Sequence, residues 1–72
     1  MFYLYIKTPT KVEVYKLQKY ADREPILKRL NLNTDSYIFI GDAIYHKLGL
    51  DGKTPEEQYE ILDRDLYNYK EN

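Results

Sequence analysis

The sequence contains no cysteine and no tryptophan, and only one histidine among its 72 residues. Without cysteine, neither a disulfide framework nor a thiolate zinc site can form. These are the cross-links that usually stabilise small secreted domains. The single histidine, His46, has no second imidazole with which to build a typical zinc site. We therefore expect a fold that is held together by packing alone, with no metal site and no cofactor.

Long apolar runs are also missing. The apolar N-terminal segment, residues 1–6, is followed at once by Lys7-Thr8-Pro9 and is preceded by no basic stretch. It is too short to span a membrane and lacks the pattern of a signal peptide. We expect a cytoplasmic protein that does not contact membranes.

Motifs that carry catalytic chemistry are absent as well. Glycine occurs three times, and no glycine-rich phosphate-binding loop can be assembled from these positions. The sole serine, Ser36, lacks the flanking glycines of a nucleophile elbow. Asp63 and Asp65 would point roughly 200° apart on a helix, so the two carboxylates cannot act on one substrate. The sequence therefore predicts a protein that is not an enzyme.

The residues that are present suffice for one small core. Leu, Ile, Val and Phe account for 19 of the 72 residues, which exceeds the level at which highly charged chains stay disordered. Nine tyrosines supply most of the remaining apolar surface, so several rings must lie partly in the core. A chain of this length forms one domain, which we assign to residues 1–72.

Apolar and polar residues alternate in the N-terminal part, which predicts a β-hairpin. The alternation covers residues 2–7, stops at a turn that Pro9 favours, and resumes over residues 12–15. It fails at Lys16, and we expect the strand to end or bulge near this residue. A third, buried strand is predicted over residues 37–40, closed by Gly41.

Capping signals predict two short helices around the third strand. Asp22 and Pro25 favour a helix start, and the apolar stripe Ile26, Leu27 and Leu30 follows. Asp42 is expected to cap the second short helix, which should stop at Gly49-Leu50 in a Schellman motif.

A longer helix is predicted at the C-terminus. Thr54-Pro55-Glu56-Glu57 has a hydroxyl at the cap, proline at the first helical position and a carboxylate that closes a capping box. Tyr59, Leu62, Leu66 and Tyr69 then share one helical stripe. The expected fold is a single α+β domain in the order ββαβαα, in which helices pack on a three-stranded sheet.

Charge is distributed unevenly along the chain. Residues 1–50 contain eight basic and five acidic side chains, whereas residues 51–72 contain three and seven. The last helix is therefore acidic, and one of its stripes consists of Glu56, Glu60, Asp63 and Tyr67. We predict that this stripe binds a basic groove on a larger protein, because tyrosine is a frequent anchor at interfaces.

Aromatic residues next to lysines suggest an alternative, single-stranded nucleic-acid binding. The residues concerned are Tyr3, Tyr5 and Tyr15 with Lys7 and Lys16, and we expect the three rings to share the sheet face opposite Phe2. Rings on a sheet bordered by lysines can stack bases. A net charge of −1 provides little long-range attraction to phosphate, which makes this the second choice.

The sequence thus favours a small, non-enzymatic protein-binding domain. Residues encoded by AT-rich codons number 30 against 11 Gly, Ala, Arg and Pro, which favours a phage or other mobile element as the source. We hypothesise an inhibitor or adaptor that occludes a larger, nucleic-acid-handling protein. A homodimer joined through exposed tyrosines stays open as a further alternative.

Overall fold

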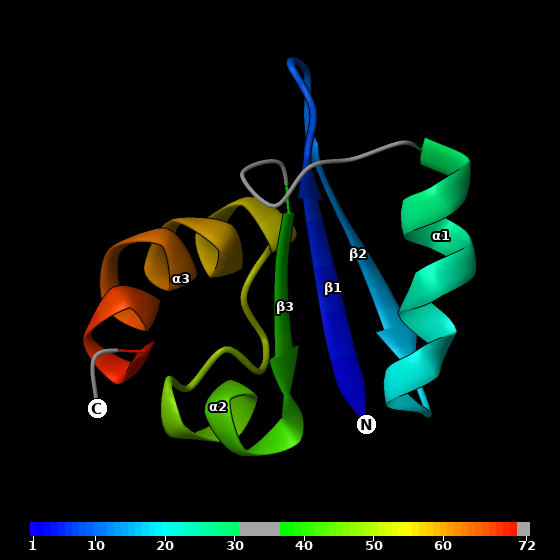
Figure 1. Ribbon diagram of the computed structural model, residues 1–72. Helices are drawn as coiled ribbons and strands as arrows, with labels where there is room; N and C mark the ends of the chain where they lie inside the picture. Colours follow the sequence, from blue (N-terminus) through cyan, green and yellow to red (C-terminus); the bar gives the residue numbers. More distant parts are fainter. Residues whose placement is uncertain (31–36, 71–72) are drawn as a thin grey trace.

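Strands and helices follow one another along the chain in the predicted order. The computed structural model describes residues 1–30 and 37–70, except for the side chains of residues 66–70. The elements are β1 (Phe2–Lys7), β2 (Val12–Leu17), a 3₁₀ turn η1 (Tyr20–Asp22), α1 (Arg23–Leu30), β3 (Tyr37–Gly41), α2 (Asp42–Lys47) and α3 (Pro55–Lys70) (Figure 1). The prediction of an α+β domain with the order ββαβαα is confirmed.

The sheet is antiparallel, with β1 between β2 and β3. Residues directly opposite each other on antiparallel strands share a face. Tyr5 pairs with Val14 and Ile38, and this side of the sheet is called the tyrosine face here. The other side, on which Leu4 pairs with Tyr15 and Phe39, is called the phenylalanine face.

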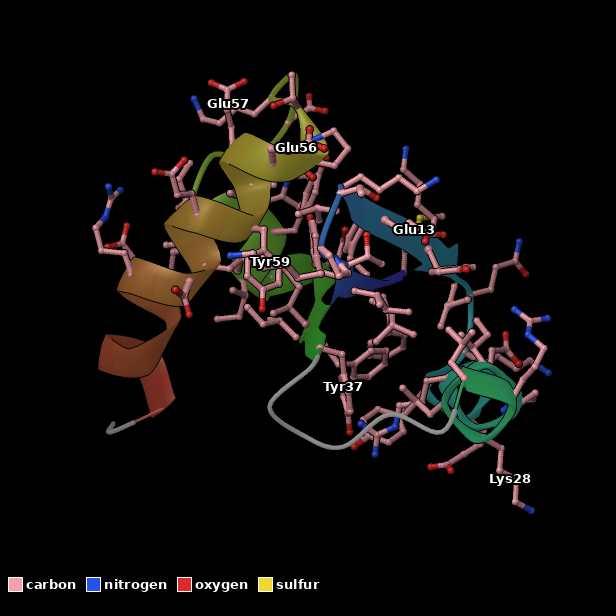
Figure 2. The ribbon with its side chains drawn as sticks, turned by 90° about the horizontal axis from the view of Figure 1, so that it is seen from above. Glu13, Lys28, Tyr37, Glu56, Glu57 and Tyr59 are labelled. Atoms are coloured by element: carbon pink, nitrogen blue, oxygen red, sulfur yellow. The ribbon has the colours of Figure 1, made fainter. Side chains whose placement is uncertain are left out.

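Helices cover both faces of this sheet. Side chains of α2 and α3 pack with Tyr3 and Tyr5 on the tyrosine face. On the phenylalanine face, the rings of Phe2, Tyr20 and Phe39 lie within 5.8 Å of one another between centroids, and the Arg23 guanidinium lies 4.3 Å from the Tyr20 ring. Figures 1 and 2 accordingly show α1 across the sheet from α2 and α3. No helix in the described ranges has the length and apolar character needed to cross a membrane.

The core is built from both faces of β1. Its fully or nearly buried apolar residues are Tyr3, Leu4, Tyr5, Ile6, Ile40, Tyr45, Leu50 and Leu62. Three of them are tyrosines, which confirms that the aliphatic residues alone do not fill the interior.

The end of α2 is a Schellman motif, as predicted. The Leu50 N–H donates to the Tyr45 carbonyl at 3.2 Å, and the Gly49 N–H donates to the His46 carbonyl at 3.1 Å. Gly49 has φ = 64°, the left-handed conformation that this motif requires. The following residue, Leu50, is fully buried, so the stop also returns the chain to the core.

The start of α3 forms the predicted capping box. The Glu57 N–H donates to Thr54 Oγ1 at 3.2 Å, and the Thr54 N–H donates to Glu57 Oε1 at 3.2 Å. The Thr54 hydroxyl also donates to Glu57 Oε1 at 3.0 Å, and the two bonds from the Thr54 N–H and hydroxyl lower the pKa of the Glu57 carboxyl. The local sequence therefore fixes the first turn of α3.

Strand β2 ends at Leu17, near the predicted position; Lys16 points from the tyrosine face into an open cleft, and Leu17 pairs with Phe2 on the other face. The predicted cap of α2 is wrong. Asp42 does not cap α2, because Gly41 occupies the cap position. The Asp42 carboxylate instead accepts a hydrogen bond from the Tyr3 hydroxyl at 3.3 Å.

Gln58 is the buried polar side chain that joins the parts of the tyrosine face. Its Oε1 accepts a hydrogen bond from the Tyr5 hydroxyl at 2.9 Å. Its Nε2 donates to the carbonyls of Leu50 at 2.7 Å and Lys53 at 3.1 Å. One amide therefore links β1, the α2–α3 connection and α3, and leaves no donor or acceptor of this group unsatisfied in the interior.

The role of Gln58 predicts a large loss of stability on truncation. Gln58→Ala leaves the buried Tyr5 hydroxyl without its partner and removes the amide hydrogen bonds to the Leu50 and Lys53 carbonyls, so we expect the free energy of unfolding to fall by about 2–4 kcal/mol. Glu60→Ala, an exposed substitution on the same helix, should change it by less than about 0.5 kcal/mol. Urea unfolding followed by circular dichroism measures both, and equal effects would contradict the assigned role.

The conformation of Gly49 predicts a smaller, purely local effect. A Cβ at this position would meet no other atom within 4 Å, so only the positive φ opposes a side chain. We expect Gly49→Ala to cost about 1 kcal/mol and Gly49→Asn to cost less, because asparagine tolerates the left-handed region. Thermal unfolding of the two variants tests this order.

Candidate functional site

The outward side of α3 carries the predicted acidic stripe. Glu56, Glu60 and Asp63 are all exposed. Neither Glu60 nor Asp63 forms a hydrogen bond or ion pair with any other residue of the described ranges. Glu56 accepts a long hydrogen bond, 3.4 Å, from the Val12 N–H of β2. The structure thus brings the three carboxylates together on one surface.

Tyr59 lies beside this stripe, between α3 and the hairpin (Figure 2). Its ring is half-buried, and the Lys7 ammonium lies 5.6 Å from the ring centroid. Burial raises the pKa of the Tyr59 hydroxyl, and the negative charge of Asp63 raises it further. Tyr59 therefore adds a neutral aromatic surface next to the carboxylates.

The fourth residue of the predicted stripe is Tyr67. Its backbone belongs to α3, but its side chain lies outside the part of the chain that the structure describes. Leu66 and Tyr69, which were expected on the packing face, lie outside it as well. Among the described side chains, the acidic surface of α3 consists of Glu56, Glu60 and Asp63.

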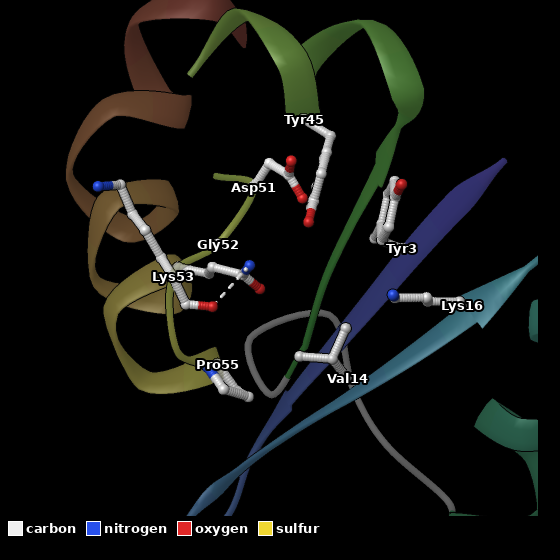
Figure 3. A pocket seen from close by; sticks show the side chains of 9 residues that line it. Tyr3, Val14, Lys16, Tyr45, Asp51, Gly52, Lys53 and Pro55 are labelled. Carbon is white, nitrogen blue, oxygen red and sulfur yellow. Dashed lines mark hydrogen bonds between the residues drawn. The ribbon is translucent and has the colours of Figure 1, made fainter. Parts of the chain in front are cut away.

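A cleft of about 270 Å³ opens on the tyrosine face between β2 and the α2–α3 connection. Lys16 and Asp51 point into it from opposite walls, and Val14 and Pro55 supply its apolar surface (Figure 3). The volume lies below the range of about 300–1,000 Å³ that is typical of small-molecule sites. It exceeds what a few water molecules fill, so it leaves room for a side chain of another molecule.

Two stacked tyrosines form the rigid end of this cleft. The rings of Tyr3 and Tyr45 are nearly parallel, with centroids 3.9 Å apart. Burial raises the pKa of the Tyr3 hydroxyl, and the charge of Asp42, which accepts its hydrogen bond, raises it further. His46 Nε2 lies 3.5 Å from the same Asp42 carboxylate, on the exposed side of α2. The group is a polar anchor for α2 and contains no nucleophile–base pair.

The surface predicted for nucleic-acid stacking does not form. Tyr3 retains 6% of its surface and Tyr5 none, because α2 and α3 cover the tyrosine face. Tyr15 lies on the opposite face, where its hydroxyl donates to Glu13 at 3.3 Å. The error has a simple origin: the hairpin pairs Lys7 with Val12, and this register places Tyr15 opposite Leu4.

The lysines of that prediction are exposed, but they are not grouped with the rings as expected. Lys7 lies near Tyr59, and Lys16 borders the cleft beside the buried Tyr3. A lysine next to a covered ring cannot complete a base-stacking platform, which needs an open aromatic face.

Sequence reasoning missed Gln58, Tyr45 and Asp51. Gln58 lies between Ile61 and Leu62 when residues are placed at 100° per position, so its place in the packing face could have been found. Tyr45 and Asp51 carry no such signal, because their positions depend on how the α2–α3 connection folds back on the sheet.

Comparison of the chain with models of protein families, with curated protein sequences and with solved structures finds no match. The function is therefore argued from the geometry alone.

The burial of Tyr5 predicts a loss of stability in alkali. Burial raises the pKa of its hydroxyl above the ordinary value of 10.0. The unfolded chain therefore releases this proton first, so the stabilisation is complete below pH 10 and is lost as the pH rises further. Relative to Tyr5→Phe, the wild-type protein should lose about 1.4 kcal/mol between pH 8 and pH 11. Urea unfolding of both proteins at the two pH values measures the difference, and a constant difference would contradict burial of this hydroxyl.

Proposed function

We propose that this protein is a small, non-enzymatic binding domain that docks on a larger protein through the acidic surface of α3. The observation that supports this proposal most directly is the pair of exposed carboxylates, Glu60 and Asp63, which form no hydrogen bond or ion pair with another described residue. The nearby Arg64 guanidinium, whose pKa the Glu60 charge helps to raise, is itself paired with Asp65. Repulsion between like charges four and three residues apart disfavours such a row in an isolated helix. A basic partner removes that repulsion.

The geometry around the stripe supports the same function. The capping box and Gln58 fix α3 at its first turns, so the helix backbone that carries the carboxylates is held in place before binding. Little backbone entropy is then lost when a partner binds. Tyr59 adds an aromatic contact at the edge of the charged surface, which is the composition of many interface anchors.

Occlusion is the mode of action that fits a domain of this size. A row of carboxylates on a rigid helix resembles the spacing of negative charge along a nucleic acid, and long-range attraction steers it to basic grooves. We propose that the partner is a nucleic-acid-handling protein whose basic groove the domain covers, as an inhibitor or adaptor. The domain itself supplies no reacting group in this proposal.

Reversal of the charges of Glu60 and Asp63 tests the proposal. The variant Glu60→Lys/Asp63→Lys should lose at least tenfold in affinity for the partner, because two attractive charges become repulsive ones. The tagged wild-type protein first captures the partner from an extract of the source organism at about 0.1 M salt, and mass spectrometry identifies it. Titration of that purified partner with each variant then measures the affinity.

Glu24→Lys provides the control, because Glu24 is exposed on α1 at the other side of the sheet. This variant should bind like the wild-type protein. Capture of the same partner with unchanged affinity by Glu60→Lys/Asp63→Lys would refute the proposal. An equal loss in the Glu24→Lys control would refute it as well, because net charge and not the stripe would then determine binding.

A further inference from the structure

Strand β2 is an edge of the sheet, and the contact of Val12 with Glu56 reaches its outer side. The Val12 N–H, which donates to the Glu56 carboxylate, points away from β1. Backbone groups of alternate residues in a strand point to the same side. The N–H and C=O groups of Val14 and Lys16 therefore also point outward, along an edge that pairs with no strand in the described ranges.

This edge is complementary to itself under a two-fold rotation. If two copies pair antiparallel with Val14 at the centre, Val14 lies opposite Val14 and Val12 lies opposite Lys16 of the second copy. Val12, Val14 and Lys16 all have N–H and C=O groups that point away from β1, so backbone hydrogen bonds can join the two sheets. The result is a continuous sheet with the tyrosine faces of both copies on the same side.

The charges near the edge match in the same arrangement. Lys16 is exposed, and its ammonium has no partner among the described residues. Pairing places it beside Val12 of the second copy, where the Glu56 carboxylate lies. The present contact of Glu56 with the Val12 N–H is 3.4 Å, longer than the usual 2.7–3.2 Å, so a backbone carbonyl can replace it. Glu56 is then available for Lys16 of the other copy.

The surroundings leave space for this pairing. The cleft of about 270 Å³ borders Val14 and Lys16 on the tyrosine face, where the first turn of α3 from the second copy would approach. Figure 3 shows the Lys16 ammonium at the open side of this cleft. On the other face, Glu13 and Tyr15, which already form a hydrogen bond of 3.3 Å within one chain, would lie opposite each other between copies.

We propose that the protein forms a two-fold symmetric homodimer through β2, with reciprocal Lys16–Glu56 ion pairs at the two ends of the joined strands. The dimer does not require the partner proposed above, although both use Glu56, and it is tested on the purified protein without that partner. An exposed hydrophobic strand edge is a site of uncontrolled pairing, and this closed arrangement removes two such edges at once.

Charge exchange tests the proposal. Lys16→Glu and Glu56→Lys should each weaken dimerisation at least tenfold, because each brings like charges together at both symmetry-related positions. The double variant Lys16→Glu/Glu56→Lys restores opposite charges and should return the dissociation constant to within about threefold of the wild-type value. Sedimentation velocity over protein concentrations up to the millimolar range measures all four proteins.

Removal of the backbone donor is the second arm. Lys16→Pro deletes an outward N–H at an edge position, where proline is tolerated in a folded sheet, and should abolish the dimer. Lys16→Gln, which keeps the N–H, is its control and should weaken the dimer less. Circular dichroism verifies that each variant is folded. A monomeric wild-type protein at millimolar concentration, or a dimer that is insensitive to Lys16→Pro or is not restored by the charge exchange, would overturn the proposal.

Discussion

The three hydrogen bonds of the Gln58 amide hold the domain in its arrangement. They join the Tyr5 hydroxyl in the central strand to the carbonyls of Leu50 and Lys53, which lie before α3. The bonds to the Tyr5 hydroxyl and the Leu50 carbonyl are buried, and a rotation of α3 against the sheet would break them. The orientation that these bonds hold turns Glu60 and Asp63 to the outside. The orientation of the acidic surface is thus a consequence of a polar contact in the core.

Tyrosine plays a related part in the rest of the interior. A ring fills as much space as a large aliphatic side chain, but its hydroxyl must reach a partner or water. In this protein the Tyr5 hydroxyl bonds to Gln58 and the Tyr3 hydroxyl bonds to Asp42. These contacts tie both helices of the tyrosine face to β1. The tyrosine-rich composition therefore builds the core and its polar anchors, and leaves these two rings unavailable for binding.

The features that were predicted correctly from the sequence depend on interactions between residues close together in the chain. The alternation in β1, the Schellman motif at Gly49 and the capping box at Thr54 involve residues within a few positions of one another, so their patterns can be read directly. The exposed acidic stripe of α3 followed from helical periodicity for the same reason. Whether it binds a partner stays a prediction.

What the sequence could not provide depends on contacts between distant segments. The face on which Tyr15 lies depends on the register of the hairpin, and the burial of Tyr3 depends on helices that follow some forty residues later. Gln58 was missed because a polar residue in a packing stripe counts against the apolar pattern. The role of Gln58 can be recognised only when the fold brings the Tyr5 hydroxyl, 53 positions away, into hydrogen-bond contact with it.

The two proposed surfaces meet at one residue, and this has a thermodynamic consequence. Glu56 stands at the end of the acidic stripe and also touches the Val12 N–H on the edge of β2. A partner that takes the Glu56 carboxylate removes the counter-charge of Lys16 in the dimer, whereas a partner confined to Glu60 and Asp63 does not. In the first case the partner weakens dimerisation, and dimerisation weakens the affinity for the partner by the same factor, as thermodynamic linkage requires. In the second case the dimer presents two acidic surfaces at once. A partner with two basic sites then binds the dimer more tightly than a monomer, because its second site binds at a high effective concentration.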